Sequence, residues 1–246
     1  MISEAWIGEG LGAIAAVALA AGGCAHAAMW STSQIFGRTL VAPPRPGEIA
    51  LTFDDGPNPA WTPRLLEILA KHGVKATFFL IGKFAAEETV LTRSIANGGH
   101  TIGNHSWSHP NLALTAPAKV RDELRRTSGT LEEITGQPVK FFRPPYGGRR
   151  PDVLSAARKL GMTPVMWNSM TNDWEERRPE AIAERMAAKV DAASRSGRAA
   201  NIVLHDGGHT GLGIDRGPSV NAAELLLERY AAARKFVTVE EWVLQA

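Results

Sequence analysis

Two adjacent carboxylates, Asp54 and Asp55, come directly after the apolar run Ile49–Phe53. Successive side chains of a strand point to opposite faces, and two neighbouring carboxylates repel each other, so we expect the pair to divide its work. One carboxylate would bind a metal ion while the other accepts a proton. The alternative is an ordinary turn, because the next residues, Gly56-Pro57, are typical of turns.

Two histidines four residues apart, His105 and His109, follow another short apolar stretch. A helical turn would place both imidazoles on one face, where they suit a divalent ion such as Zn²⁺. Together with one carboxylate they offer three protein ligands and leave a position for water. Two alternatives stay open: a packed pair of structural histidines, and the rival pair His205 and His209. The two glycines inside the rival pair disfavour the helical turn that would align it.

Three more polar residues fall at the ends of expected strands: Arg143, Asp173 and His205. Arg143 precedes two prolines that stiffen its backbone, and its guanidinium can hold a carboxylate with two hydrogen bonds. Asp173 and His205 can form an orienting pair that sets the protonation state of a general acid. The alternatives are a surface arginine, a solvated aspartate and a core histidine.

These residues need a scaffold that brings strand ends together. After residue 47, apolar runs bounded by glycine or proline alternate with amphipathic stretches. The expected strands are Ile49–Phe53, Ala76–Ile81, His100–Gly103, Phe141–Arg143, Met162–Trp167, a sixth leading to Thr171, Ile202–Leu204 and Phe236–Val239. The expected helices are Trp61–His72, Lys83–Asn97, Ala118–Thr135, Pro151–Leu160, Pro179–Ser194, Val220–Ala233 and a short terminal helix. This alternation predicts an α/β fold with a parallel sheet, open or closed into a barrel, with its chemistry at the carboxyl ends of the strands.

Composition narrows the function classes. The 246 residues are 44% hydrophobic, enough for one domain with a sizeable core. Lys and Arg total 27 against 25 Asp and Glu, so we expect no nucleic-acid partner. The single cysteine, Cys24, excludes a multi-cysteine metal site, so any metal ion must bind His, Asp or Glu.

Residues 1–46 are expected to lie outside the catalytic domain, which would span residues 47–246. Leu11–Ala21 is an Ala-rich apolar run, and Ala25-His26-Ala27 after it resembles a signal-peptide cleavage site. Extended to Trp30, the run has the ~20 residues of a membrane anchor. We therefore expect a secreted or membrane-anchored protein. The residues before the run carry no Lys or Arg, which argues against export, so an Ala-rich first helix on a cytoplasmic domain is the alternative. The Pro-rich Val41–Gly47 is the expected linker.

Five motifs, in this order, closely resemble those of the polysaccharide deacetylase family, carbohydrate esterase family 4. They are Thr-Phe-Asp-Asp-Gly at 52–56, His-Ser-x-x-His at 105–109, Arg-Pro-Pro-Tyr at 143–146, Asp-Trp at 173–174 and Leu-His-Asp at 204–206. The resemblance covers residues 48–243. It implies a distorted (β/α)7–8 barrel that removes N- or O-acetyl groups from sugars with a divalent ion, usually Zn²⁺, with Co²⁺ or another ion as alternatives.

The resemblance also implies roles for the acidic, histidine and arginine residues of the first three motifs. Asp54 would be the catalytic base, held by Arg143. Asp55, His105 and His109 would be the metal ligands. One position departs from the family: an additional Asp is common three residues before the Asp-Trp pair, and this chain has Met170 there.

The remaining motifs would carry the acid and the substrate contacts. Asp173 would tune His205, the catalytic acid. Trp174 and Leu204 would form the pocket for the acetyl methyl group, and the backbone N–H of Tyr146 would help bind the oxyanion.

The leading hypothesis is therefore an N-deacetylase acting on glycans that contain N-acetylglucosamine, such as peptidoglycan or chitin. An O-acetyl esterase on a polysaccharide such as xylan would use the same residues. A glycan-binding relic without activity is the alternative from a different class, and a missing metal ligand would favour it. We expect an acetylated glycan as partner and, through the N-terminal segment, membrane association.

Overall fold

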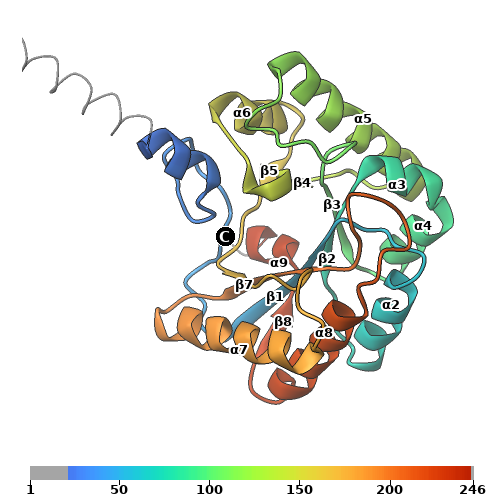
Figure 1. Ribbon diagram of the computed structural model, residues 1–246, viewed down its shortest axis with the longest axis vertical. Coiled ribbons are helices and arrows are strands. Elements are labelled where there is room, and N and C mark those ends of the chain that lie inside the picture. Colours follow the sequence, from blue (N-terminus) through green and yellow to red (C-terminus); the bar gives the residue numbers. More distant parts are fainter. Residues whose placement is uncertain (1–21, 245–246) are drawn as a thin grey trace, which may run out of the picture.

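The structure, a computed structural model, describes residues 22–244. Its eight strands are parallel and form one curved sheet with helices around it (Figure 1). The strands are β1 (Glu48–Asp54), β2 (Thr77–Leu80), β3 (Thr101–Asn104), β4 (Phe141–Phe142), β5 (Thr163–Pro164), β6 (Ser169–Met170), β7 (Ala200–His205) and β8 (Lys235–Val237). They are hydrogen-bonded in the order β5-β4-β3-β2-β1-β7-β6, and β8 pairs with the first half of β1. The expected distorted (β/α) barrel is confirmed.

Helices follow most of the strands, and the last helix comes after β8. They are α2 (Thr62–Lys71), α3 (Gly82–Glu87), α4 (Thr89–Asn97), α5 (Pro117–Thr135), α6 (Pro151–Lys159), α7 (Pro179–Arg195), α8 (Gly217–Tyr230) and α9 (Val239–Leu244). Five of them, α2, α5, α6, α7 and α8, have a proline in their first positions, where the missing N–H costs nothing. α5 ends at Gly136, whose φ of 68° suits a left-handed helix cap.

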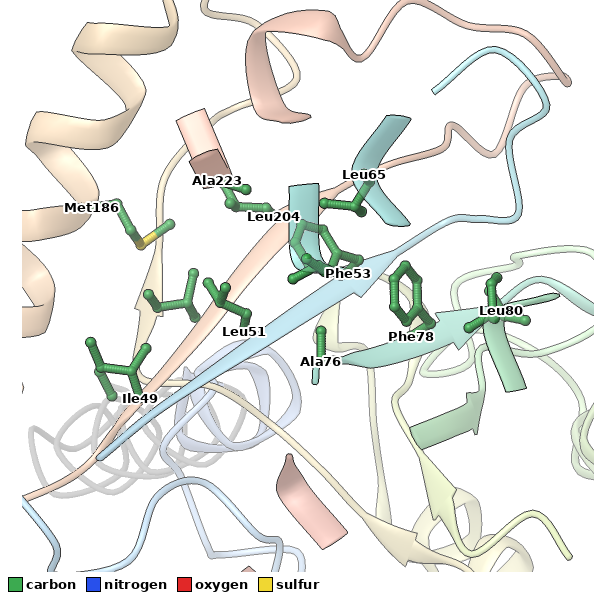
Figure 2. Packing of buried hydrophobic residues seen from close by; sticks show 14 of the residues in the cluster. Ile49, Leu51, Phe53, Leu65, Ala76, Phe78, Leu80, Met186, Leu204 and Ala223 are labelled. Carbon is green, nitrogen blue, oxygen red and sulfur yellow. The ribbon is translucent and has the colours of Figure 1, made fainter. Parts of the chain in front are cut away.

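The two faces of β1 divide the core from the site. Ile49, Leu51 and Phe53 point toward the helices and pack in the main hydrophobic core, as Figure 2 shows. Because side chains alternate along a strand, Ala50 and Asp54 face the interior of the barrel instead. Ala50 belongs to a second, smaller buried cluster, and Asp54 lines a cavity at the carboxyl end of the strand.

The barrel is completed by the segment that precedes β1. Strands β5 and β6 stand at the two ends of the pairing order, so the sheet leaves a seam between them. Leu40 forms a parallel bridge with Val165, just after β5, and on the other side Asn201 of β7 donates a hydrogen bond to the Val41 carbonyl at 2.8 Å. Residues 40–41 therefore fill the seam.

The structure contains a part of the expected N-terminal appendage. Residues 22–29 are helical, and within residues 22–244 we find no helix with the length and apolarity of a membrane span. The apolar run Leu11–Ala21 lies outside the described residues. Residues 40–46 contact the barrel, although the domain boundary at residue 47 stays a prediction.

Two expected elements differ from those observed. The expected helix Lys83–Asn97 is two helices, α3 and α4, because Glu88 takes a non-helical conformation with φ −110° and ψ 52°. Both pieces bury apolar residues, so the sequence pattern runs across the break. Of the expected strand Met162–Trp167, only Thr163–Pro164 is a strand, β5. Val165 still donates to the Phe142 carbonyl of β4, but Val165 and Met166 also pair with Leu40.

Candidate active site

A cavity of about 330 Å³ opens at the carboxyl ends of the strands. Its lining includes most of the candidate site residues, whereas Arg143 and Asp173 are buried behind it. The lining residues are Asp54, Asp55, His105, His109, Pro144, Tyr146, Trp167, Met170, Trp174, Val203, His205, His209 and Arg216. Groups distant in sequence thus meet at one edge of the sheet, as a parallel barrel requires.

Asp54 is held by a fully buried arginine. Arg143 Nη1 donates to Asp54 Oδ1 at 2.8 Å and to the Thr52 hydroxyl at 2.6 Å. The guanidinium also lies over the Phe79 ring, 4.1 Å from its centroid. With one oxygen engaged by Arg143, the other oxygen of Asp54, Oδ2, lies 3.9 Å from His105 Nε2. Asp54 is thereby fixed at the edge of the histidine cluster.

Asp55 reaches the same cavity because the chain turns sharply after β1. Its φ of 70° is in the left-handed region, which is unfavourable for a residue with a side chain and is typical of functional sites. Asp55 Oδ1 lies 3.1 Å from His109 Nε2 and 3.4 Å from His105 Nε2. The two neighbouring carboxylates therefore do different things: one contacts arginine and the other contacts two histidines.

The Asp55, His105 and His109 side chains fit a divalent ion. One ligand atom from each lies within 4.8 Å of the others. His105 Nδ1 is 2.8 Å from the Arg143 carbonyl, so this nitrogen carries the proton and Nε2 presents a lone pair toward Asp55. Asp55 Oδ1 is buried without a hydrogen-bond donor. A buried carboxylate that faces imidazole lone pairs suits a divalent cation.

The histidine pair is brought together by a loop and not by the helical turn that the spacing suggested. Ser106 and His109 have φ values of 63° and 60°. Glu123, buried on α5, accepts hydrogen bonds from the backbone N–H groups of Trp107 and Ser108 at 2.8 and 2.7 Å. This carboxylate fixes the loop, and the two imidazole rings end 5.0 Å apart.

His205 faces the ligand cluster with its orientation fixed by Asp173. The Asp173 carboxylate contacts His205 Nδ1 and accepts from the His205 backbone N–H, both at 2.9 Å. Ser219 Oγ donates to the same carboxylate at 2.5 Å. Burial acts to lower the pKa of His205, but the charge of Asp173 outweighs it and the pKa rises to about 9. His205 is therefore protonated at neutral pH, with Nε2 left for a ligand.

The expected methyl pocket needs one correction. Trp174 lines the cavity, and its ring meets the His205 ring edge-on at 5.1 Å. Leu204 does not line the cavity: it is fully buried in the helix-side core (Figure 2). Side chains alternate between the two faces of β7. Because His205 faces the cavity, Leu204 points to the opposite face and Val203 points into the cavity.

Three further residues lie at or near the site: His209, a member of the rival histidine pair, and Arg216 and Glu123, which no motif marked. His209 stacks on His109 with 4.6 Å between ring centroids, but its Nδ1 is 3.9 Å from Asp55 Oδ2, outside the closest ligand group. Arg216 lines the cavity, and its Nε donates to the Gly207 carbonyl at 2.6 Å. Glu123 had a signal, since it is a carboxylate on the apolar face of α5. The spacing of four from His205 marked His209, and no comparable signal marked Arg216.

Replacing Gly207 by alanine is expected to abolish activity and metal binding. A Cβ at this position would lie 2.1 Å from the Asp55 carbonyl oxygen, so the turn that aims Asp55 would have to move. Gly211→Ala is the matched control, because nothing lies within 4 Å of its added Cβ. Metal analysis and acetate release from both variants test this, and a Gly207→Ala protein that keeps both properties contradicts the close approach.

A parallel barrel with carboxylates, histidines and an arginine gathered at its carboxyl end defines a barrel hydrolase. The polysaccharide deacetylase family profile matches residues 42–165. A chitooligosaccharide deacetylase of Azorhizobium caulinodans is 38% identical over 175 residues, covering 71% of this chain and 80% of the relative. This chain belongs to the polysaccharide deacetylase family, and its relatives support polysaccharide deacetylase activity.

Two further similarities bear on the substrate. A peptidoglycan-N-acetylglucosamine deacetylase of Bacillus cereus is 43% identical over 146 residues, covering 59% of this chain and 53% of the relative. A family 4 acetyl xylan esterase of Clostridium thermocellum, solved in complex with a cobalt ion, superimposes with a TM-score of 0.70 and 29% identity. That match covers 80% of this chain and 91% of the esterase.

Proposed function

We propose that this chain removes N-acetyl groups from glycans that contain N-acetylglucosamine, using a divalent ion held by Asp55, His105 and His109. The proposal rests mainly on the different contacts of the two adjacent carboxylates: Arg143 holds Asp54, while two histidines contact Asp55. Zn²⁺ is the proposed ion, because two imidazoles and one carboxylate are a ligand set typical of catalytic zinc. The relatives named for chitooligosaccharide and peptidoglycan suggest the glycan class.

The bound ion would polarise the acetyl carbonyl and activate a water molecule. Asp54 accepts the proton of that attacking water, since Arg143 keeps its carboxylate oriented beside the ligand cluster. The backbone N–H of Tyr146 stabilises the oxyanion. His205 then donates its Nε2 proton to the leaving nitrogen, while Asp173 holds Nδ1. Acetate and a free amino sugar result.

Acetate release from a panel of acetylated glycans tests the proposal. Wild-type protein loaded with Zn²⁺ is expected to release acetate from chitooligosaccharides or peptidoglycan. The second candidate, an O-acetyl esterase, is favoured by the similarity to the acetyl xylan esterase and predicts release from acetylated xylan alone. Release from none of these substrates by the metal-loaded protein contradicts both candidates and favours a glycan-binding relic.

Replacing Asp173 by asparagine is expected to shift the alkaline limb of the pH profile to lower pH. A general acid must be protonated, so activity is lost as the pH rises through the pKa of His205, which Asp173 raises to about 9. Without that charge the pKa falls, and the variant loses more activity at pH 8.5 than at pH 6. The control is Asp122→Asn on the exposed face of α5. The measurement is the pH profile of kcat/KM between about pH 5 and 10. An alkaline limb that does not move in Asp173→Asn contradicts His205 as the general acid.

We also propose that the protein works outside the cytoplasm, either cleaved or anchored, at the cell wall. The apolar run before Ala27 and the polymeric substrate support this location. N-terminal sequencing of the protein from its native host provides the test. A processed N-terminus or recovery in the membrane fraction supports the proposal, and a cytoplasmic chain that begins at Met1 contradicts it.

A further inference from the structure

The turn that carries Tyr146 has an unfavourable backbone. Tyr146 and Gly147 are both in the left-handed region, with φ values of 57° and 68°. A side chain at positive φ persists only where the surrounding structure holds it. The Tyr146 side chain is 49% exposed, so its own packing gives the turn limited support. The Tyr146 ring also contacts His109, with 4.6 Å between ring centroids, and a contact from outside the turn would hold this part of the cavity wall further.

Arg149 is the group in contact with the turn. Its side chain is buried, with 1% of the residue exposed, and its Nη1 donates to the Gly147 carbonyl at 3.1 Å. Its Nη2 donates to the carbonyls of Trp30 at 2.6 Å and Ser33 at 3.0 Å. Its backbone N–H donates to the Ala28 carbonyl at 3.1 Å. One residue thus joins the cavity turn to residues 28–33.

The charge of Arg149 makes this link hard to break. Among residues 22–244 no carboxylate pairs with it, so backbone carbonyls alone satisfy the buried guanidinium. If residues 28–33 moved away, the guanidinium would lose both acceptors of Nη2, and nothing in the described chain would hold it in its present orientation against the Gly147 carbonyl. The turn and residues 28–33 should therefore open and close together.

We propose that Arg149 is a positioning residue through which residues 28–33 hold the Tyr146 turn in the conformation that the reaction needs. The segment before the barrel is then part of the active-site architecture. Because the bonds run to residues 28–33, cleavage after Ala27 would leave the link intact. The catalytic consequence rests on the proposed function, in which the Tyr146 N–H binds the oxyanion.

Hydrogen exchange tests the link without using activity. In full-length Arg149→Met, amide exchange is expected to rise at Gly147 and Gly148, whose N–H groups bond within the turn, and also at residues 28–33. The control is Arg158→Met: Arg158 Nη2 makes the same kind of bond to a backbone carbonyl before the barrel, that of Arg38 at 2.5 Å, but it bonds neither to residues 28–33 nor to the turn. If amide exchange in Arg149→Met rises only in the turn or only in residues 28–33, the proposed link is wrong.

Kinetics test the positioning role. Arg149→Met is expected to lower kcat at least 10-fold, with KM changed less than threefold and metal content unchanged, whereas Arg158→Met stays near wild type. Arg149→Lys keeps the charge but cannot reach both the turn and residues 28–33, so its kcat should lie between those of wild type and Arg149→Met.

If Arg149→Met does not fold, Arg149→Lys alone must show the coupled exchange and a lowered kcat. An unchanged kcat in a folded variant overturns the role. A wild type without deacetylase activity refutes the proposed function instead and leaves the exchange test valid.

Discussion

Replacing Asp54 by asparagine is expected to lower kcat about 100- to 10,000-fold, the range that a positioned proton acceptor typically contributes. Asparagine keeps the shape of the side chain and can still accept a hydrogen bond from Arg143, but it cannot take up a proton. Metal content should stay that of the wild type, because Asp55 and not Asp54 stands nearest both histidines. Kinetics on an N-acetylated oligosaccharide, together with metal analysis, provide the measurement.

The matched control for this variant is Asp152→Asn. Asp152 also forms an aspartate–arginine pair, with Arg150 at 2.7 Å, but it lies outside the cavity. Its kcat should remain within about twofold of wild type, since surface ion pairs contribute little. Because Asp54→Asn leaves Arg143 buried without a counter-charge, its thermal midpoint should fall, so kcat is measured well below that temperature. A folded Asp54→Asn protein with near wild-type kcat refutes the assignment of the base.

Replacing His105 by alanine is expected to remove both the metal ion and the activity. Losing a residue that only hydrogen-bonds a metal ligand typically weakens metal binding ~10- to 100-fold, so loss of one of three direct ligands should cost more. Metal analysis after dialysis should find about one ion per chain in wild type and almost none in the variant.

His209→Ala is the control for the ligand assignment. The His209 ring stacks on His109, but its side chain is 41% exposed. It is not part of the ligand group formed by Asp55, His105 and His109. His209→Ala should therefore retain the ion. Loss of metal from His209→Ala together with its retention in His105→Ala would reverse the choice between the two histidine pairs.

Much of the site follows from the order of the motifs along the chain. Parallel strands present their carboxyl ends at one edge, so Asp54, His105, Arg143 and His205 had to meet once the alternation of strands and helices was recognised. Their spacing did not reveal how they meet. The approach of His105 and His109 depends on left-handed residues in the loop and on Glu123 from a distant helix.

The other differences have different physical origins. Leu204 and Val203 are both apolar, and the expected pocket overlooked that alternation along β7 puts Val203, not Leu204, on the same face as His205. The start of the expected linker, Val41, belongs to the barrel together with Leu40. The sequence does not show this, because their hydrogen bonds run to residues more than a hundred positions away. The break between α3 and α4 leaves no trace in a pattern that stays amphipathic on both sides.

The central claim, deacetylation of a glycan through a divalent ion held at Asp55, is tested most directly by removing and restoring that ion. Purified protein is treated with a chelator, dialysed and assayed for acetate release from N-acetylglucosamine oligomers, then reloaded with Zn²⁺ or Co²⁺. We predict that release stops without the ion and returns as one ion per chain rebinds, and that His105→Ala recovers nothing. Full activity of the metal-free protein would contradict the claim.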